Sequence, residues 1–164
     1  MTRKIVILFL ILIAVSCGIS RQRIEIPDYL VVSNGKEILG NKSLNAFVFE
    51  NNLKNIPFQQ YVSSKFKSNN FFQKEIWIAI DNDKFKLIFY DNDEFEKYMG
   101  TSNYVALNQE TAANKTGNNA KFIAISMINS QNEDCLIEGS LYQNIAISYL
   151  KKLKDDYLKN NGQF

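Results

Sequence analysis

The sequence predicts an α+β fold in which helices cover one face of a mixed or antiparallel sheet. Two patterns alternate along residues 29–164. Short runs with an apolar residue at every second position, bounded by Asn, Asp and Gly, indicate strands. Longer segments with apolar residues three and four positions apart indicate amphipathic helices. Hydrophobic residues make up 46% of the chain and aromatic residues 13%, which is enough apolar surface for one core.

The first strands are expected near the start of this region. Residues 29–33 and 36–39 flank Asn34-Gly35, a dipeptide that type I′ hairpin turns favour because both central residues need a positive φ. An N-terminal hairpin is therefore predicted here. Residues 45–50 are apolar on both faces, which is typical of a central strand.

A helix and a second hairpin follow. Pro57 suits the first position of a helix, and the apolar residues after it recur at helical spacing to about residue 67. Residues 75–81 and 84–90 alternate between apolar and polar side chains, with Asp and Asn between them. Two alternating runs joined by such residues predict a pair of antiparallel strands.

The next segment predicts a short capped helix, a loop and a strand. Asp91 can accept hydrogen bonds from free helix amides while Glu94, three positions later, reaches back to the residue 91 amide. Gly100 is expected to end this helix. Residues 101–120 are polar and predict a long surface loop, whereas residues 121–128 form a strongly apolar strand.

The last element is a long amphipathic helix. Apolar residues recur at helical spacing over 141–157. Ser140 could cap this helix, and Ser130 with Glu133 offers an earlier start. Gly139 favours the later start, since glycine weakens a helix interior.

The order of elements suggests a specific topology. Without the N-terminal hairpin and the C-terminal helix, the order is strand-helix-strand-strand-helix-strand, which is that of a ferredoxin-like βαββαβ core. Right-handed crossovers would place strands 45–50 and 84–90 at the centre of the sheet.

The first seventeen residues carry an export pattern. Arg3 and Lys4 form a positive head, residues 5–15 are apolar, and Ser16 precedes Cys17 after further small residues. A short positive head, an apolar run and a small-residue cleavage site are typical of a secretory signal. With a cysteine at the cleavage site, the segment resembles the lipobox of bacterial lipoprotein precursors. No family resemblance is found for the rest of the chain.

The lipoprotein resemblance implies a defined processing. Cleavage would fall between Ser16 and Cys17. The Cys17 sulfur would then carry a diacylglyceryl group, and its new amine would carry an acyl group such as palmitate. Two or three acyl chains anchor a protein stably, whereas one chain holds it only marginally. The alternatives are a membrane-spanning anchor, for which eleven apolar residues are too few, and a cleaved signal without lipid.

The resemblance also predicts location and domain organisation. In lipoproteins, Gly18 after the cysteine favours the outer membrane, which suggests a protein of the cell envelope that faces the periplasm. The expected organisation is a signal peptide over residues 1–16, a lipidated N-terminus and tether over 17–28, and one α+β domain over 29–164.

Charge and composition exclude several functions. Removing Arg3 and Lys4 from the 19 basic residues leaves 17, equal to the 17 acidic residues, so no nucleic-acid partner is expected. The chain contains no histidine, which excludes histidine-based catalysis and histidine-ligated metals. If Cys17 is acylated, Cys135 has no partner in the chain, and a buried, inert thiol is expected.

Acidic residues give the only cluster with possible chemistry. Carboxylates can bind hard cations or catalyse glycoside hydrolysis, but Asx residues at turns and helix caps also form local backbone hydrogen bonds. If strands 75–81 and 84–90 pair, the acidic residues of the turn between them lie about 20 Å from those at the start of the next helix. We therefore expect no metal site, no cofactor and no catalytic residue among Asp81, Asp83, Asp91, Asp93 and Glu94.

A second apolar sheet face is the candidate partner surface. In the predicted strands 75–81 and 84–90, Trp77, Ile88 and Tyr90 point away from the main core. The C-terminal helix or the N-terminal hairpin could cover this face. If neither does, it forms an apolar patch suited to a partner. Other aromatic residues such as Tyr104 could line a ligand surface, although aromatic residues in strands and helices are usually core.

These observations favour a membrane-anchored, non-enzymatic binding or interaction module with a protein partner in the envelope. The alternatives are a carboxylate-dependent hydrolase and a lipoprotein that binds a small ligand or a metal.

Overall fold

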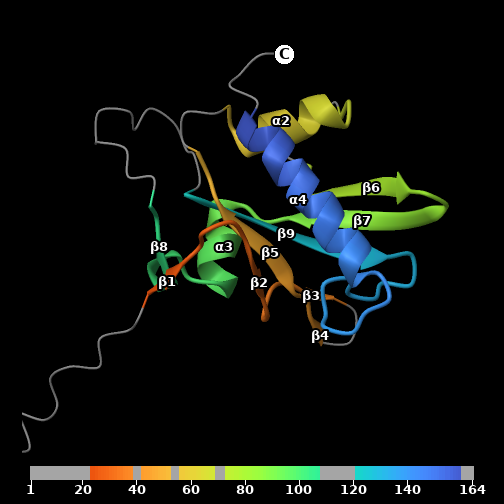
Figure 1. Cartoon of the computed structure of the whole chain (residues 1–164), viewed down its shortest axis with the longest axis horizontal. Coiled ribbons are helices and arrows are strands. Elements are labelled where there is room, and N and C mark those ends of the chain that lie inside the picture. The colour runs from red at the N-terminus through yellow and green to blue at the C-terminus, as the bar shows by residue number, and fades with distance from the viewer. Residues whose placement is uncertain (1–22, 39–41, 53–55, 69–72, 108–120, 160–164) are drawn as a thin grey trace, which may run out of the picture.

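The computed structural model describes residues 23–38, 42–52, 56–68, 73–107 and 121–159. These residues form an α+β fold, as the sequence predicts. Its centre is an antiparallel sheet of five strands in the order β2-β5-β9-β7-β6 (Figure 1). The strands are β2 (Leu30–Val32), β5 (Ala46–Glu50), β9 (Phe122–Asn129), β7 (Asp83–Phe89) and β6 (Glu75–Ile80).

Two helices cover the first face of the sheet. They are α2 (Phe58–Lys65) and α4 (Gln143–Lys159), which crosses the strands in Figure 1. Tyr157 of α4 is fully buried, and its ring centroid lies 5.0 Å from that of Phe58 and 5.2 Å from that of Tyr61. Its hydroxyl donates to Asn51 Oδ1 at 2.7 Å, so the largest core of the domain also contains a buried polar contact.

The second face is covered by smaller elements. A third helix, α3 (Asn92–Tyr98), and the 3₁₀ turn η1 (Thr101–Asn103) pack there. Beside them, β1 (Ile24–Glu25) pairs in parallel with β8 (Tyr104–Val105). The antiparallel pair β3 (Glu37–Ile38) and β4 (Lys42–Ser43) lies in the connection between β2 and β5. The expectation of helices on one face only is therefore wrong, because α3 packs on the second face.

The prediction of an N-terminal hairpin is also wrong. Leu30 of β2 lies opposite Val48 of β5, and Glu37 and Ile38 pair with β4 and not with β2. Asn34 has a positive φ of 71°, so the chain does turn there. Gly35 is needed for another reason. A Cβ at this position would overlap the Tyr90 hydroxyl and lie 2.7 Å from the Leu44 carbonyl oxygen.

The ferredoxin-like order does not occur. That topology would place β5 directly beside β7, whereas β9 lies between them and is antiparallel to both. All eight residues of β9 are buried. The strand predicted at 121–128 is thus the central one, while β5 is flanked on its other side by the short β2.

Elements with strong local signals are confirmed. Strands β6 and β7 form the predicted hairpin, with Ile80 opposite Asp83. Helix α2 begins directly after Pro57. Before α4, the Ser140 hydroxyl accepts the Tyr142 N–H at 3.3 Å, which favours the later of the two predicted starts.

The domain begins earlier than predicted. Ile26 is buried, with 3% of its surface exposed, and Asp28 forms ion pairs with Lys154 and Lys151 of α4. Residues 23–28 therefore belong to the domain and not to a tether. In the expected loop 101–120, Tyr104 is buried in the core of the second face, and residues 108–120 lie outside the described residues.

Candidate functional site

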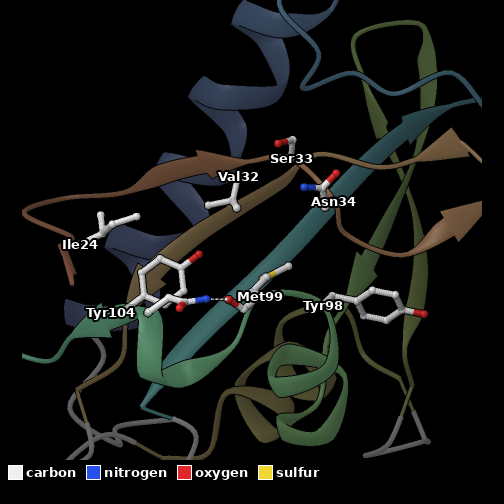
Figure 2. Close-up of a pocket in the computed structure, with 8 residues that line it drawn as sticks. Ile24, Val32, Ser33, Asn34, Tyr98, Met99 and Tyr104 are labelled. Carbon is white, nitrogen blue, oxygen red and sulfur yellow. Dashed lines mark hydrogen bonds between the residues drawn. The ribbon is translucent and has the colours of Figure 1, made fainter. Parts of the chain in front are cut away.

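A pocket of about 450 Å³ opens on the second face, where three distant segments meet. Figure 2 shows the end of β2 and the turn after it on one side, and the end of α3 with η1 on the other. Strand β1 closes one end. The lining residues are Ile24, Val32, Ser33, Asn34, Tyr98, Met99, Asn103 and Tyr104.

The chain after α3 shapes the floor of this pocket. Met99 ends the helix, and Gly100 has a φ of 70°, a conformation that L side chains rarely adopt. The reversal at Gly100 starts η1, in which the Asn103 side-chain amide donates to the Met99 carbonyl at 2.7 Å. Tyr104 then lies opposite Ile24 in the parallel pair of β1 and β8.

The lining changes in character from the floor to the rim. Met99 and Tyr104 are buried, with 5% and 6% of their surfaces exposed. The polar residues Ser33, Asn34 and Asn103 are exposed at the rim. None of the described lining residues carries a formal charge. Burial raises the pKa of Tyr104 above its usual value of 10, so its hydroxyl stays protonated at neutral pH.

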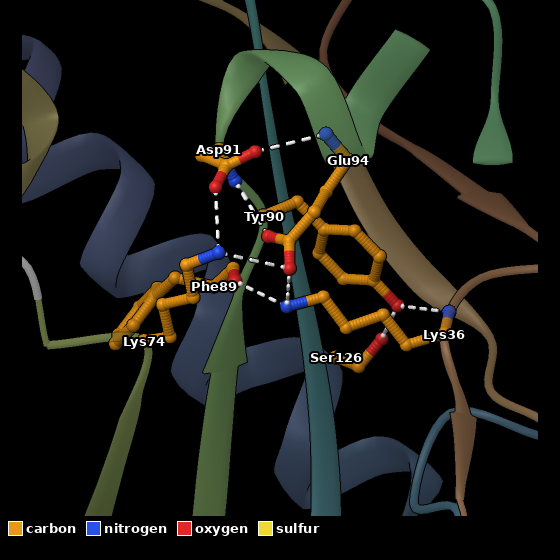
Figure 3. Close-up of polar contacts among 7 residues, drawn as sticks. All are labelled: Lys36, Lys74, Phe89, Tyr90, Asp91, Glu94 and Ser126. Atoms are coloured by element: carbon orange, nitrogen blue, oxygen red, sulfur yellow. Dashed lines mark hydrogen bonds and ion pairs between the residues drawn. The ribbon is translucent and has the colours of Figure 1, made fainter. Parts of the chain in front are cut away.

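A network of ion pairs and hydrogen bonds lies beside the strand and helix that line the pocket. Figure 3 shows the Lys36 ammonium between the Glu94 carboxylate, at 2.8 Å, and the Phe89 carbonyl oxygen, at 3.1 Å. The same ammonium lies 4.9 Å from the centre of the Tyr90 ring. These contacts hold the segment after β2 against the end of β7 and the start of α3.

The capping box of α3 is part of this network. The Glu94 N–H donates to Asp91 Oδ1 at 2.8 Å, and the Asp91 N–H donates to Glu94 Oε2 at 3.0 Å. Lys74 pairs with both carboxylates, at 2.6 and 3.1 Å. The hydrogen bond from Lys74 and that from the Glu94 amide lower the pKa of Asp91. Burial opposes ionisation of Glu94, but hydrogen bonds from Lys36, the Asp91 amide and Lys74 bring its pKa below the usual range.

This network stabilises the fold, and the pKa values of its carboxylates do not suit proton transfer. A general acid or base needs a pKa near the working pH, whereas the pKa values of Asp91 and Glu94 are shifted down. Asp81 and Asp83 lie at the β6–β7 turn, away from α3. In the part of the chain that the structure describes, no three acidic or cysteine side chains gather closely enough to hold a metal ion.

The predicted partner face does not exist as a continuous patch. Ile88 and Tyr90 are buried, with 3% and 6% of their surfaces exposed. The segment between β2 and β5 covers them: Leu44 packs on Ile88, and the Tyr90 hydroxyl accepts the Lys36 N–H at 2.8 Å. Ile88 and Tyr90 therefore offer no partner surface, because the chain from the predicted first hairpin to Leu44 folds over this face.

Trp77 is the exposed member of the predicted face. Slightly over half of its surface, 54%, is accessible. The Lys86 ammonium lies 5.0 Å from the centre of its ring and pairs with Glu75 at 3.1 Å. Trp77 is therefore partly covered by a charged side chain and stands apart from the buried Ile88.

Cys135 is a buried thiol, as the sequence predicts. Only 1% of its surface is exposed, and burial raises its pKa to about 12. The neighbouring carboxylate of Asp134 accepts backbone N–H groups from Asn45, at 2.7 Å, and Leu136, at 2.8 Å. Burial also raises the pKa of Asp134. Ser16 and Cys17 lie outside the described residues.

Three comparisons give no relative. No protein-family model, no curated protein and no solved structure matches this chain. Its function is thus argued from its own residues. Within the described ranges, none of the helices is both long and apolar enough to span a membrane.

The pocket has no signature in the sequence. Its lining residues come from positions 24, 32–34 and 98–104, and no local pattern links these segments. Tyr104, one of the aromatic residues that could line a ligand surface, does lie in the pocket. The other available signal was Gly100, which marks a chain reversal between two tyrosines.

Proposed function

We propose that this chain is a lipid-anchored protein of the bacterial cell envelope whose domain acts by binding and not by catalysis. The proposal combines the N-terminal pattern, which resembles a lipobox that ends at Cys17, with the pocket on the second face. The pocket's volume of about 450 Å³ lies in the range of small-molecule sites.

One observation carries the proposal: the pocket adjoins the N-terminal end of the described domain. Ile24 belongs both to the first strand and to the pocket lining. Ile24 lies seven residues after Cys17, and seven extended residues span at most about 25 Å. An acylated Cys17 would therefore hold the pocket close to the membrane.

The hydrolase alternative has less support. Asp91 and Glu94 form a helix cap and ion pairs with lysines, and both pKa values are lowered. The pocket lining offers tyrosine, serine and asparagine but no carboxylate among the described residues. These groups can hydrogen-bond a ligand, yet they lack a general base for hydrolysis at neutral pH.

Cys17 provides the test of anchoring. The full chain with Cys17→Ser, expressed in a bacterial host, should remain an uncleaved or unlipidated precursor. Intact-mass measurement of the wild-type mature protein should give a chain that starts at residue 17 and carries acyl groups. Cys135→Ala is the matched control, since it also removes a cysteine but should leave processing and membrane fractionation unchanged. The proposal fails if Cys17→Ser is processed in the same way as the wild type, apart from the mass of the substitution itself, and still fractionates with membranes.

A further inference from the structure

We propose that two copies of this chain associate through strand β6, at the edge of the central sheet, with the two β6 strands antiparallel around a two-fold axis at Trp77. This pairing joins two five-stranded sheets into one continuous sheet. It uses a surface separate from the pocket and does not depend on a lipid anchor. Three features of β6 carry the inference: its unused backbone groups, the exposure of its side chains and the charges beside it.

The two edges of the sheet differ in length. Strand β2 at one edge has three residues, whereas β6 at the other edge has six, with a single charge at its start. Proteins usually protect a long edge with lysine, proline or a bulge, because its free N–H and C=O groups can pair with another strand. None of these devices occurs within β6, and among the described residues β6 pairs with β7 alone (Figure 1). The β6 edge is therefore open to a further strand.

The hairpin register determines which backbone groups of β6 are available. The Phe89 N–H donates to the Lys74 carbonyl at 2.8 Å, so these two residues form a hydrogen-bonded pair. Such pairs alternate along an antiparallel ladder, and the three isoleucines of β6 therefore bond to β7. The residues whose N–H and C=O groups point away from β7 are Glu75, Trp77 and Ala79. In agreement, the Glu75 carbonyl accepts the side-chain amide of Gln73 at 2.8 Å instead of a β7 amide.

The side chains of β6 leave this edge accessible on both faces. On the second face, Trp77 is 54% exposed and Ala79 is also exposed. On the first face, Ile78 and Ile80 are only half-buried, so α2 and α4 do not fully cover this end of the strand. A second strand beside β6 would remove part of these apolar surfaces from water, which is favourable.

The outward-pointing groups favour one register. In a pairing centred on Trp77, each Trp77 lies opposite the partner's Trp77 and Glu75 lies opposite the partner's Ala79. All three outward-pointing residues of each strand then form hydrogen-bonded pairs. A pairing centred on Ile78 would place Glu75 opposite Asp81, which lies beyond the strand and has a φ of 52°. The register at Trp77 thus forms more backbone hydrogen bonds, and its two-fold symmetry closes the assembly at a dimer.

Charge favours the same register. Lys84 lies opposite Ala79 within the hairpin and is exposed on the second face. In the pairing centred on Trp77, Glu75 of one copy and the partner's Lys84 therefore lie on the same face, on either side of the small Ala79 side chain. Their backbones are two strand spacings apart, about 10 Å, which these long side chains can bridge. In the register centred on Ile78, Glu75 would meet the Asp81 carboxylate, and like charges placed opposite each other are destabilising.

Analytical ultracentrifugation of residues 17–164 with Cys17→Ser tests the dimer. This parent chain contains every described residue and cannot associate through lipid or through a disulfide at residue 17. A contact between two six-residue strands is small, and small interfaces belong to weak complexes. We therefore expect a monomer–dimer equilibrium with a dissociation constant on the order of 10 μM. A parent chain that stays monomeric up to about 500 μM overturns the inference, and so do assemblies larger than a dimer.

Ala79→Pro tests the backbone pairing. The residue 79 N–H points away from β7, so proline removes no hydrogen bond of the hairpin, and edge strands tolerate proline at such positions. Its ring would occupy the place of the second strand. The dissociation constant should rise by about tenfold or more, with an unchanged circular dichroism spectrum. If Ala79→Pro does not fold, Trp77→Lys is the second edge variant, because it places two ammonium groups opposite each other. Folded edge variants that dimerise like the parent contradict the proposal.

Charge reversal tests the register. Glu75→Lys and Lys84→Glu each bring like charges together, and each should raise the dissociation constant by about three- to tenfold, since the dimer contains the pair twice. The double variant should bind more tightly than Glu75→Lys. Both of these variants lack the Glu75–Lys86 pair of the hairpin, so their difference reports the contact between copies. Lys97→Glu on α3 matches the charge change of Lys84→Glu and should leave dimerisation unchanged. A double variant that dimerises no better than Glu75→Lys rules out this pairing.

Discussion

The backbone N–H of Lys36 donates to the hydroxyl of Tyr90 at 2.8 Å, which joins two residues 54 positions apart. The hydroxyl also lies 2.8 Å from Ser126 Oγ, on the central strand. This contact holds the segment between β2 and β5 over the second face of the sheet. It also explains why Tyr90, which was predicted on the second face of the sheet, is buried.

Gly35 makes this contact possible, so Gly35→Ala should destabilise the domain. The added Cβ would overlap the Tyr90 hydroxyl and the Leu44 carbonyl oxygen. Overpacking of this kind costs about 1–3 kcal/mol. The free energy of unfolding can be measured by urea denaturation of the mature chain.

A double-mutant cycle identifies the cause. Removing the hydroxyl with Tyr90→Phe should reduce the cost of Gly35→Ala, because one of the two overlaps disappears. If Gly35→Ala costs the same in both backgrounds, the close approach to Tyr90 is not the reason for glycine at this position.

The ion pair of Asp28 with Lys154 should fasten residues 23–28 to α4. Only 5% of the Lys154 side chain is exposed, and Asp28 is its partner across 126 positions of the chain. Asp28→Asn leaves this buried ammonium with Asp155, at 3.2 Å, as its remaining carboxylate partner. We expect a loss of about 1–3 kcal/mol in unfolding free energy and faster proteolysis at residues 17–28.

Adding Lys154→Met to Asp28→Asn tests whether the unpaired ammonium causes this loss. The double variant Asp28→Asn with Lys154→Met should be more stable than Asp28→Asn alone, because methionine removes the poorly paired buried charge. A double variant less stable than either single one would show that the two side chains act independently.

Asp91 should stabilise α3 in a pH-dependent way. Asp91→Ala removes both the cap and the pair with Lys74, and loss of a cap alone costs about 0.5–2 kcal/mol. Asp91→Asn keeps a capping oxygen and loses the charge. Thermal unfolding at pH 7 should therefore rank wild type above Asp91→Asn and Asp91→Asn above Asp91→Ala.

The sign of the pH effect follows from the lowered pKa. The folded-state pKa of Asp91 lies below its ordinary value of 3.8, so its charge stabilises the fold above that value and the effect is lost as pH falls through the folded pKa. The difference between wild type and Asp91→Asn should be largest near pH 7 and shrink below about pH 4. A constant difference from pH 7 to pH 3 would contradict this assignment.

Cys135 should be unreactive in the folded protein. Its pKa is raised to about 12, and the thiolate is the reactive form. In a Cys17→Ser chain, labelling with a maleimide at pH 8 should be slower than in urea by on the order of a hundredfold or more. Equal rates in the two conditions would mean that the thiol is accessible in the native state.

Local signals predicted the elements, and long-range contacts decided their arrangement. The capping box of Asp91 and Glu94 involves residues three apart, so the sequence reveals α3 directly. The β6–β7 hairpin is local for the same reason. In contrast, Asn34-Gly35 resembles a hairpin turn, but Gly35 is required by a side chain 55 positions away. No local pattern contains that information.

The same distinction applies to the candidate sites. Burial of Ile88 depends on Leu44, which reaches it only through the irregular segment between β2 and β5. The pocket requires Ile24 to pair with Tyr104, 80 positions later. A two-residue strand in parallel pairing has almost no sequence signature, because both the alternation and the turn are missing. The pocket could therefore not be predicted before the fold was known.

The central position of β9 has a consequence for how the chain is made. Among the described residues, β9 is the last strand along the chain, and it separates β5 from β7. Until residue 129 is available, the sheet consists of two isolated strand pairs, β2–β5 and β6–β7, and such pairs are marginal in water. Pairing across long sequence separations also forms slowly. We therefore expect that a nascent chain of this design cannot form its five-stranded sheet before β9 has been synthesised.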